Sequence, residues 1–118
     1  MSLETLLRAV LLPVCPLVYD ADSVPDVVAK PYVTHSQIGG ASVNYVADTV
    51  PDKRNARMQI NVWATTRTSA NDLALQIEAA LIQSPAIQAR PLGAFSATSD
   101  YVTKLKGTRQ DFSIWAPR

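Results

Sequence analysis

The sequence predicts an α+β fold in which two helices pack on one face of a mainly antiparallel sheet of about four strands, in the order α-β-β-α-β-β. Three observations predict it. Residues 57–64 alternate between apolar and polar side chains, as in a half-buried strand, and residues 70–83 repeat apolar side chains at helical spacing. Two more alternating segments, 90–101 and 108–116, follow. A parallel crossover through the second helix would instead give a mixed sheet.

Size and composition favour one compact domain, residues 1–118, because 47% of the 118 residues are hydrophobic and 18% are charged. The formal net charge of +1 provides no overall attraction to nucleic acid or to acidic membranes. No apolar run reaches membrane-spanning length. Glu4 and Arg8 interrupt the apolar start, so we expect no secretion signal and a cytoplasmic origin.

A first helix is predicted at the start of the chain, where Ser2 can cap it and Pro13 ends it. Its apolar side chains recur at three- and four-residue spacing: Leu3, Leu6, Leu7, Val10 and Leu11. This single stripe favours packing beside the second helix. The proline-rich residues 14–31 should be irregular, with at most a short edge strand at 17–19.

A strand is predicted at 32–38, closed by Gly39 and Gly40. A polar connection, residues 41–56, follows. Loops of this length in small domains are usually mobile or functional. Lys53, Arg54 and Arg57, with Arg67, form a local basic group that could contact phosphate or an acidic partner; a solvated loop is the alternative.

The second helix should begin at Ala70, because Ser69 and Asp72 can satisfy its free amides, and Pro85 prevents its continuation. Its inward face consists of small and branched apolar residues: Ala70, Leu73, Ile77, Ala80 and Leu81.

The same helix has a second apolar face. Leu75, Ala79 and Ile82 project almost opposite the inward face, and one sheet can bury only one of the two. These residues are therefore either isolated exposed aliphatics or a subunit contact.

The segments 90–101 and 108–116 are predicted to form a hairpin that turns at 104–107. Phe112 and Ile114 should point to the core.

Trp63 and Trp115 then fall on the polar side of their strands. Tryptophan is favoured at protein contacts, which makes both residues candidate subunit or partner contacts. The alternative is that loop 41–56 folds over them.

Residues that would carry catalysis, a cofactor or a metal are not recognisable. Cys15 and His35 are the single cysteine and the single histidine, so an internal disulfide is excluded and a zinc site within one chain is disfavoured. No nucleophile, paired carboxylate or metal motif is present, which favours binding or structure over catalysis.

Several segments together resemble the tail-completion, or tail-terminator, proteins of long-tailed bacteriophages and prophages. They are the leucine-rich first helix, the PYV strand ending at Ile38 and Gly39, the stretch RMQINVWATTRTSANDLALQIEAAL, and the final FSIW. The resemblance covers nearly the whole chain.

This resemblance implies a structural protein without catalytic residues or cofactor. It would form a ring, typically hexameric, that ends the tail tube and joins it to the head connector in the virion. Its partners would be further copies of itself, the tail-tube protein and the connector, and DNA could pass through the ring without specific binding. A head-completion or adaptor protein is one alternative, and a small α+β enzyme or ligand-binding domain is another.

Overall fold

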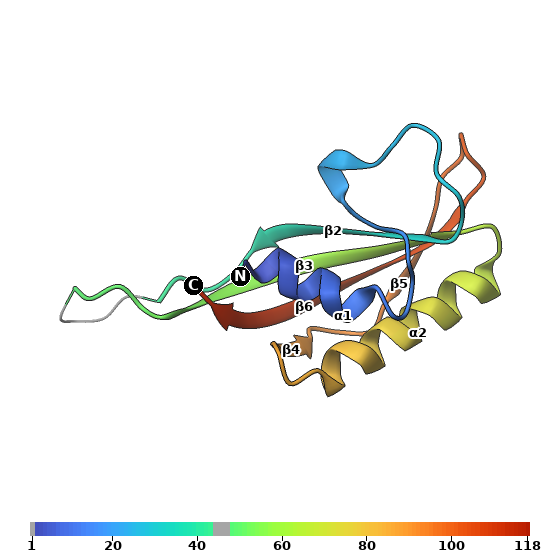
Figure 1. Cartoon of the computed structure of the whole chain (residues 1–118). Coiled ribbons are helices and arrows are strands. Elements are labelled where there is room, and N and C mark those ends of the chain that lie inside the picture. Colours follow the sequence, from blue (N-terminus) through green and yellow to red (C-terminus); the bar gives the residue numbers. More distant parts are fainter. Residues whose placement is uncertain (1, 44–47) are drawn as a thin grey trace.

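The computed structural model describes residues 2–43 and 48–118, which form a six-stranded sheet and two α-helices (Figure 1). The elements are α1 (Leu3–Leu11), β1 (Val18–Asp20), the 3₁₀ helix η1 (Ala21–Ser23), β2 (Tyr32–Gly39), β3 (Lys53–Ala64), α2 (Arg67–Gln83), β4 (Gln88–Pro91), β5 (Ser96–Ser99) and β6 (Lys106–Pro117). None of these helices is both long and apolar enough to cross a membrane.

The strand order is β1-β2-β3-β6-β4, and β5 also pairs with β6. Strand β1 is parallel to β2, and every other neighbouring pair is antiparallel. The α+β class is therefore correct, but the predicted number and order of strands are wrong. The sheet is mixed because the three-residue β1 is a true strand.

The predicted strand 90–101 is divided into β4 and β5, which pair with opposite halves of β6. Pro91 has no N–H to continue the ladder. The amide of Leu92 donates to the carbonyl of Asp111, and the carbonyl of Gly93 accepts from the Gln110 side chain. Tertiary hydrogen bonds thus fix an irregular segment where the sequence suggested one continuous strand.

One hydrophobic core lies between the sheet and both helices (Figure 1). Ile60 and Phe112, predicted to face inward, are 2% and 0% exposed. The α1 stripe is also confirmed, since three of its leucines are fully buried and the other two apolar residues pack at the edge of the core. Both α-helices therefore cover one face of the sheet, and within residues 2–43 and 48–118 the opposite face carries no α-helix.

The start of the first helix is confirmed and that of the second is corrected. The Ser2 hydroxyl accepts from the amide of Thr5, as an N-cap should. Helix α2 begins three residues before the predicted Ala70, because Thr66 is its N-cap and accepts from the amide of Ser69.

Strand β3 begins at Lys53, so the last four residues of the predicted loop 41–56 belong to the sheet. They pair with residues 114–117 of β6. The apolar alternation fails here because Arg54, at a core-side position, binds Glu4 of α1 in place of a hydrophobic contact. Residues 44–47 of the predicted loop lie outside the described residues.

Candidate subunit-contact surfaces

The outer face of α2 carries an apolar stripe, defined here as Leu75, Ala79 and Ile82. The opposite face of the helix buries Ala70, Leu73, Ala74, Ile77 and Leu81. Leu75 and Ile82 are 55% and 54% exposed, and they lie two turns apart, about 10 Å along the axis. The predicted exposure is confirmed. A contact made by this stripe remains a prediction.

Trp63 lies on the helix-free face of the sheet, as predicted, but it is half-buried. It pairs across the strands with Tyr32 on one side and Gly107 on the other. A Cβ atom on Gly107 would lie 2.8 Å from two atoms of the indole ring. Because Gly107 has no side chain, the indole ring can pack directly against the sheet. This packing explains the partial burial of Trp63 without a contact from loop 41–56.

Trp115 lies on the same face at the other end of the sheet, where it pairs with Asn55 and Gln88. It lines a hollow of about 300 Å³ together with Val43, Pro51 and neighbouring polar residues. Residues of the connecting loop therefore flank this tryptophan. Trp63 and Trp115 are not brought together, because they lie at opposite ends of the sheet.

The predicted basic group does not form a single site. Arg57 lies on the helix-free face and its guanidinium is 2.8 Å from the Asp111 carboxylate, whereas Arg54 binds Glu4 on the helix side at 2.9 Å. Arg67 donates to the carbonyls of Gly107 and Thr98 at 2.6 and 2.7 Å, anchoring the start of α2. Lys53 is exposed beside Trp115.

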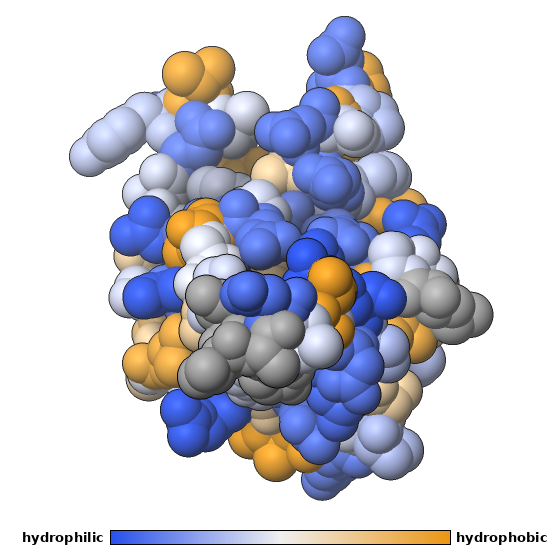
Figure 2. All heavy atoms as spheres, turned by 90° about the vertical axis from the view of Figure 1, so that its left-hand side faces the viewer, coloured by the Kyte–Doolittle hydropathy of each residue, from blue (hydrophilic) through white to orange (hydrophobic). Residues whose placement is uncertain are grey.

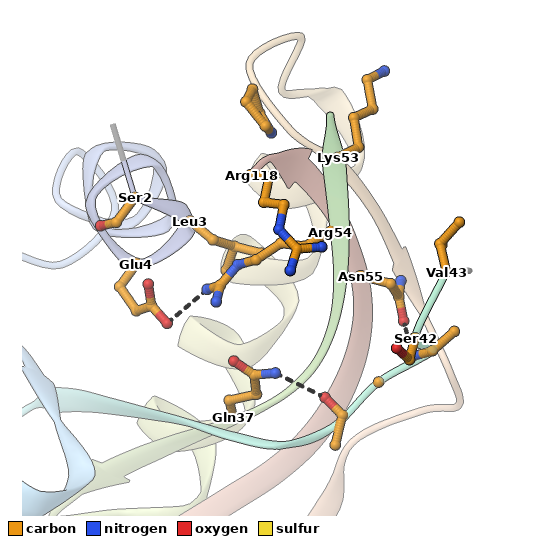
Figure 3. A pocket seen from close by; sticks show the side chains of 14 residues that line it. Ser2, Leu3, Glu4, Gln37, Ser42, Val43, Lys53, Arg54, Asn55 and Arg118 are labelled. Carbon is orange, nitrogen blue, oxygen red and sulfur yellow. Dashed lines mark hydrogen bonds and ion pairs between the residues drawn. The ribbon is translucent and has the colours of Figure 1, made fainter. Parts of the chain in front are cut away.

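A cleft of about 540 Å³ lies where the start of α1 meets the end of β2 and the start of β3 (Figure 3). Its polar groups largely satisfy one another: Arg54 binds Glu4, the Gln37 amide donates to the carbonyl of Gly39, and the Asn55 carbonyl accepts from the amide of Ala41. The contacts across the cleft therefore link elements of this chain to one another.

Three side chains with displaced pKa values lie outside that cleft. Burial, followed by the Asp100 carboxylate, raises the pKa of Tyr32. Backbone hydrogen bonds from Val102 and Thr103 lower the pKa of Asp100. Burial lowers the pKa of His35. Within residues 2–43 and 48–118, no three His, Cys, Asp or Glu residues gather as a metal site would require.

The tip of the β5–β6 hairpin, residues 100–105, is a surface that the sequence interpretation missed. It assigned Tyr101 to the end of a strand, whereas Tyr101 and Val102 are 87% and 90% exposed at a turn. The signal that could have found the turn is Asp100, since Asp side chains bond to the backbone two residues further on.

The α2 stripe, with Leu75 and Ile82 more than half exposed, is thus a candidate contact surface. Comparison with protein families shows that the model of the family described as "Tail completion protein gp17" matches residues 5–116. The chain belongs to this family. It is a phage tail completion protein, with a structural role in the virion tail. No curated protein matches the chain.

Proposed function

We propose that copies of this chain form a closed ring, hexameric in the mature particle, that terminates the tail tube and joins it to the head connector. Assembly would take place in the cytoplasm of the bacterial host, and DNA would pass through the ring without sequence-specific binding. Family membership supports the tail location and the structural role. The α2 stripe supports the step from a tail component to a self-assembling one.

The exposure of Leu75 and Ile82 carries this proposal. Each leaves more than half of its surface in water on a helix whose opposite face is fully used by the core. Burial of apolar surface is the main source of association free energy, at about 25 cal/mol per Å². A ring repeats the same contact at every subunit boundary, so a small apolar stripe is used several times in one assembly.

The double substitution Leu75→Glu with Ile82→Lys tests the ring. Both side chains are exposed, so the variant should fold with a urea midpoint close to that of the native chain. Rings should not form, because burying unpaired charge at each contact costs several kcal/mol. In a phage carrying the variant, tails should be uncontrolled in length and should lack heads. The assay must include tail tubes, since the tube can act as the template for the ring.

The matched control is Val27→Glu with Val50→Lys, which introduces the same charges at two exposed valines outside α2. This control should fold and form rings. Normal rings and infectious particles from the Leu75→Glu, Ile82→Lys variant would contradict the proposal.

A further inference from the structure

A closed ring requires two different surfaces on each subunit, because the contact between neighbours is head-to-tail. The α2 stripe supplies one surface. We propose that the hairpin tip supplies the other, with Tyr101 and Val102 docking on the α2 stripe of the neighbouring copy. This inference rests on the proposed ring and specifies which parts of two copies meet.

The hairpin tip presents two apolar side chains almost completely to water. Tyr101 is 87% exposed and Val102 is 90% exposed. Tyrosine combines a large apolar ring with a polar end, which makes it common at the centre of protein contacts. The tip and the stripe thus both present apolar side chains, which can pack against each other. Neither set of side chains belongs to the core of its own subunit.

Local hydrogen bonds hold the tip in one shape. The Asp100 carboxylate accepts from the amides of Val102 at 2.8 Å and Thr103 at 3.3 Å. The Asp100 amide donates to the carbonyl of Leu105, and the Lys104 amide donates to the carbonyl of Asp100. Lys104 adopts a positive φ of 63°, which closes the turn. A preformed tip loses less conformational entropy when it docks.

The hairpin and helix α2 extend in different directions from the sheet. In Figure 1 the hairpin rises to the top of the view from the end of the sheet where α2 begins, and α2 descends from that end to the bottom of the view. Figure 2 shows two projections standing above the body, separated by a gap. A projection and an apolar helix face that are separate from each other can repeat from copy to copy, as a head-to-tail contact requires.

The charges beside the two surfaces are also complementary. Between residues 68 and 83, α2 contains Asp72 and Glu78 and no cation. Glu78 accepts a hydrogen bond from Gln110, which leaves Asp72, exposed one turn before Leu75, as the acid beside the stripe. On the hairpin, Lys104 and Lys106 are exposed, while backbone amides bind the Asp100 carboxylate. Docking would bring Lys104 toward Asp72 and would disfavour the reversed orientation.

Cysteine crosslinking tests the contact directly. Val102→Cys and Ile82→Cys are introduced into one chain, rings are assembled on tail tubes, and a short bis-maleimide is added. The only natural thiol, Cys15, is 2% exposed and should react slowly. We expect a ladder of covalent oligomers that ends at the ring number. Neither Val102→Cys alone nor Ile82→Cys alone should give covalent oligomers. The pair Val27→Cys with Ile82→Cys should give none either.

Charge reversal provides an independent test. Asp72→Lys alone and Lys104→Asp alone should each lower the fraction of ring-bearing tails by about tenfold or more, and the two together should restore it. Rings that form without a Val102–Ile82 ladder, or a double reversal that restores nothing, would overturn this inference and leave the proposed function intact. Failure of the native chain to form rings on tubes would instead overturn the proposed function.

Discussion

The six-membered ring of the Trp63 indole occupies the space that a Cβ atom on Gly107 would need, with two ring atoms 2.8 Å from that position. The two residues pair directly across β3 and β6. An aromatic ring laid over a cross-strand glycine covers backbone that would otherwise be open to water. This arrangement keeps Trp63 half-buried on a face that carries no helix.

Gly107→Ala should therefore destabilise the protein. The new methyl group would meet the Trp63 ring and also the carbonyl oxygen of Val62, 2.8 Å away, and the backbone oxygen cannot move aside cheaply. We expect a loss of roughly 1–3 kcal/mol in the free energy of unfolding by urea. Gly93→Ala is the matched control, because no atom lies within 4 Å of its new methyl group. Equal stability of the two variants would show that Trp63 does not pack as described.

Truncation of the core should have the largest effect. Ile60 and Phe112 are 2% and 0% exposed, so replacing either with alanine should cost about 2–5 kcal/mol, against a total of about 5–15 kcal/mol for a typical domain. Gln83→Ala, at the exposed end of α2, should change stability by less than about 0.5 kcal/mol. Small and equal shifts of the urea midpoint at all three positions would contradict the assignment of the core.

Glu78 should matter to stability although it is only half-buried. Gln110 is 5% exposed, and its side-chain amide donates to the Glu78 carboxylate at 2.7 Å and to the carbonyl of Gly93 at 2.9 Å. Glu78→Ala removes one of these acceptors and should cost about 1–2 kcal/mol. Glu78→Gln keeps an acceptor oxygen and should cost less. Equal losses in thermal unfolding would mean that the hydrogen bond is not responsible.

The sequence predicted those parts of the fold that depend only on the spacing of apolar residues along one strand or one helix. Alternation identified the inward phase of β3, and three- to four-residue spacing identified both faces of α2. The parts that these patterns left incomplete or placed wrongly depend on distant residues. The short edge strand allowed for at 17–19 lies at Val18–Asp20, where it pairs with β2, and the break between β4 and β5 depends on bonds to Gln110 and Asp111.

The candidate surfaces show the same division. The exposure of Leu75 and Ile82 follows from helical geometry alone, and the sequence predicted it. The separation of Arg54 from Arg57 follows from the strand pleat, but it was hidden because only Arg57 was assigned to a strand and Arg54 was assigned to the preceding loop. The partial burial of Trp63 depends on the register between β3 and β6, and no local sequence pattern reveals that register.

His35 places a titratable group in the core. It is 5% exposed and pairs with Asp20 and Ile60 on the neighbouring strands. In the described part of the chain its Nδ1 has no hydrogen-bond partner. Burial lowers its pKa below the ordinary value of 6.5; the carboxylates of Asp20 and Glu4 act in the opposite direction, and Arg8 lowers it further.

Stability should therefore fall on mild acidification. Because the pKa is lower in the folded chain than in the unfolded chain, the unfolded chain binds the proton first, and stability present above pH 6.5 is lost as the pH falls through the folded-state pKa. Urea midpoints measured from pH 8 to pH 5 at constant ionic strength should decline below about pH 6.5. His35 is the only histidine, and ordinary carboxyl groups titrate near pH 4, so this window isolates it. His35→Gln removes the titration and should give a flat profile over the same range, whatever its absolute stability. Parallel profiles for the native and His35→Gln chains would show that burial of the imidazole does not control the acid response.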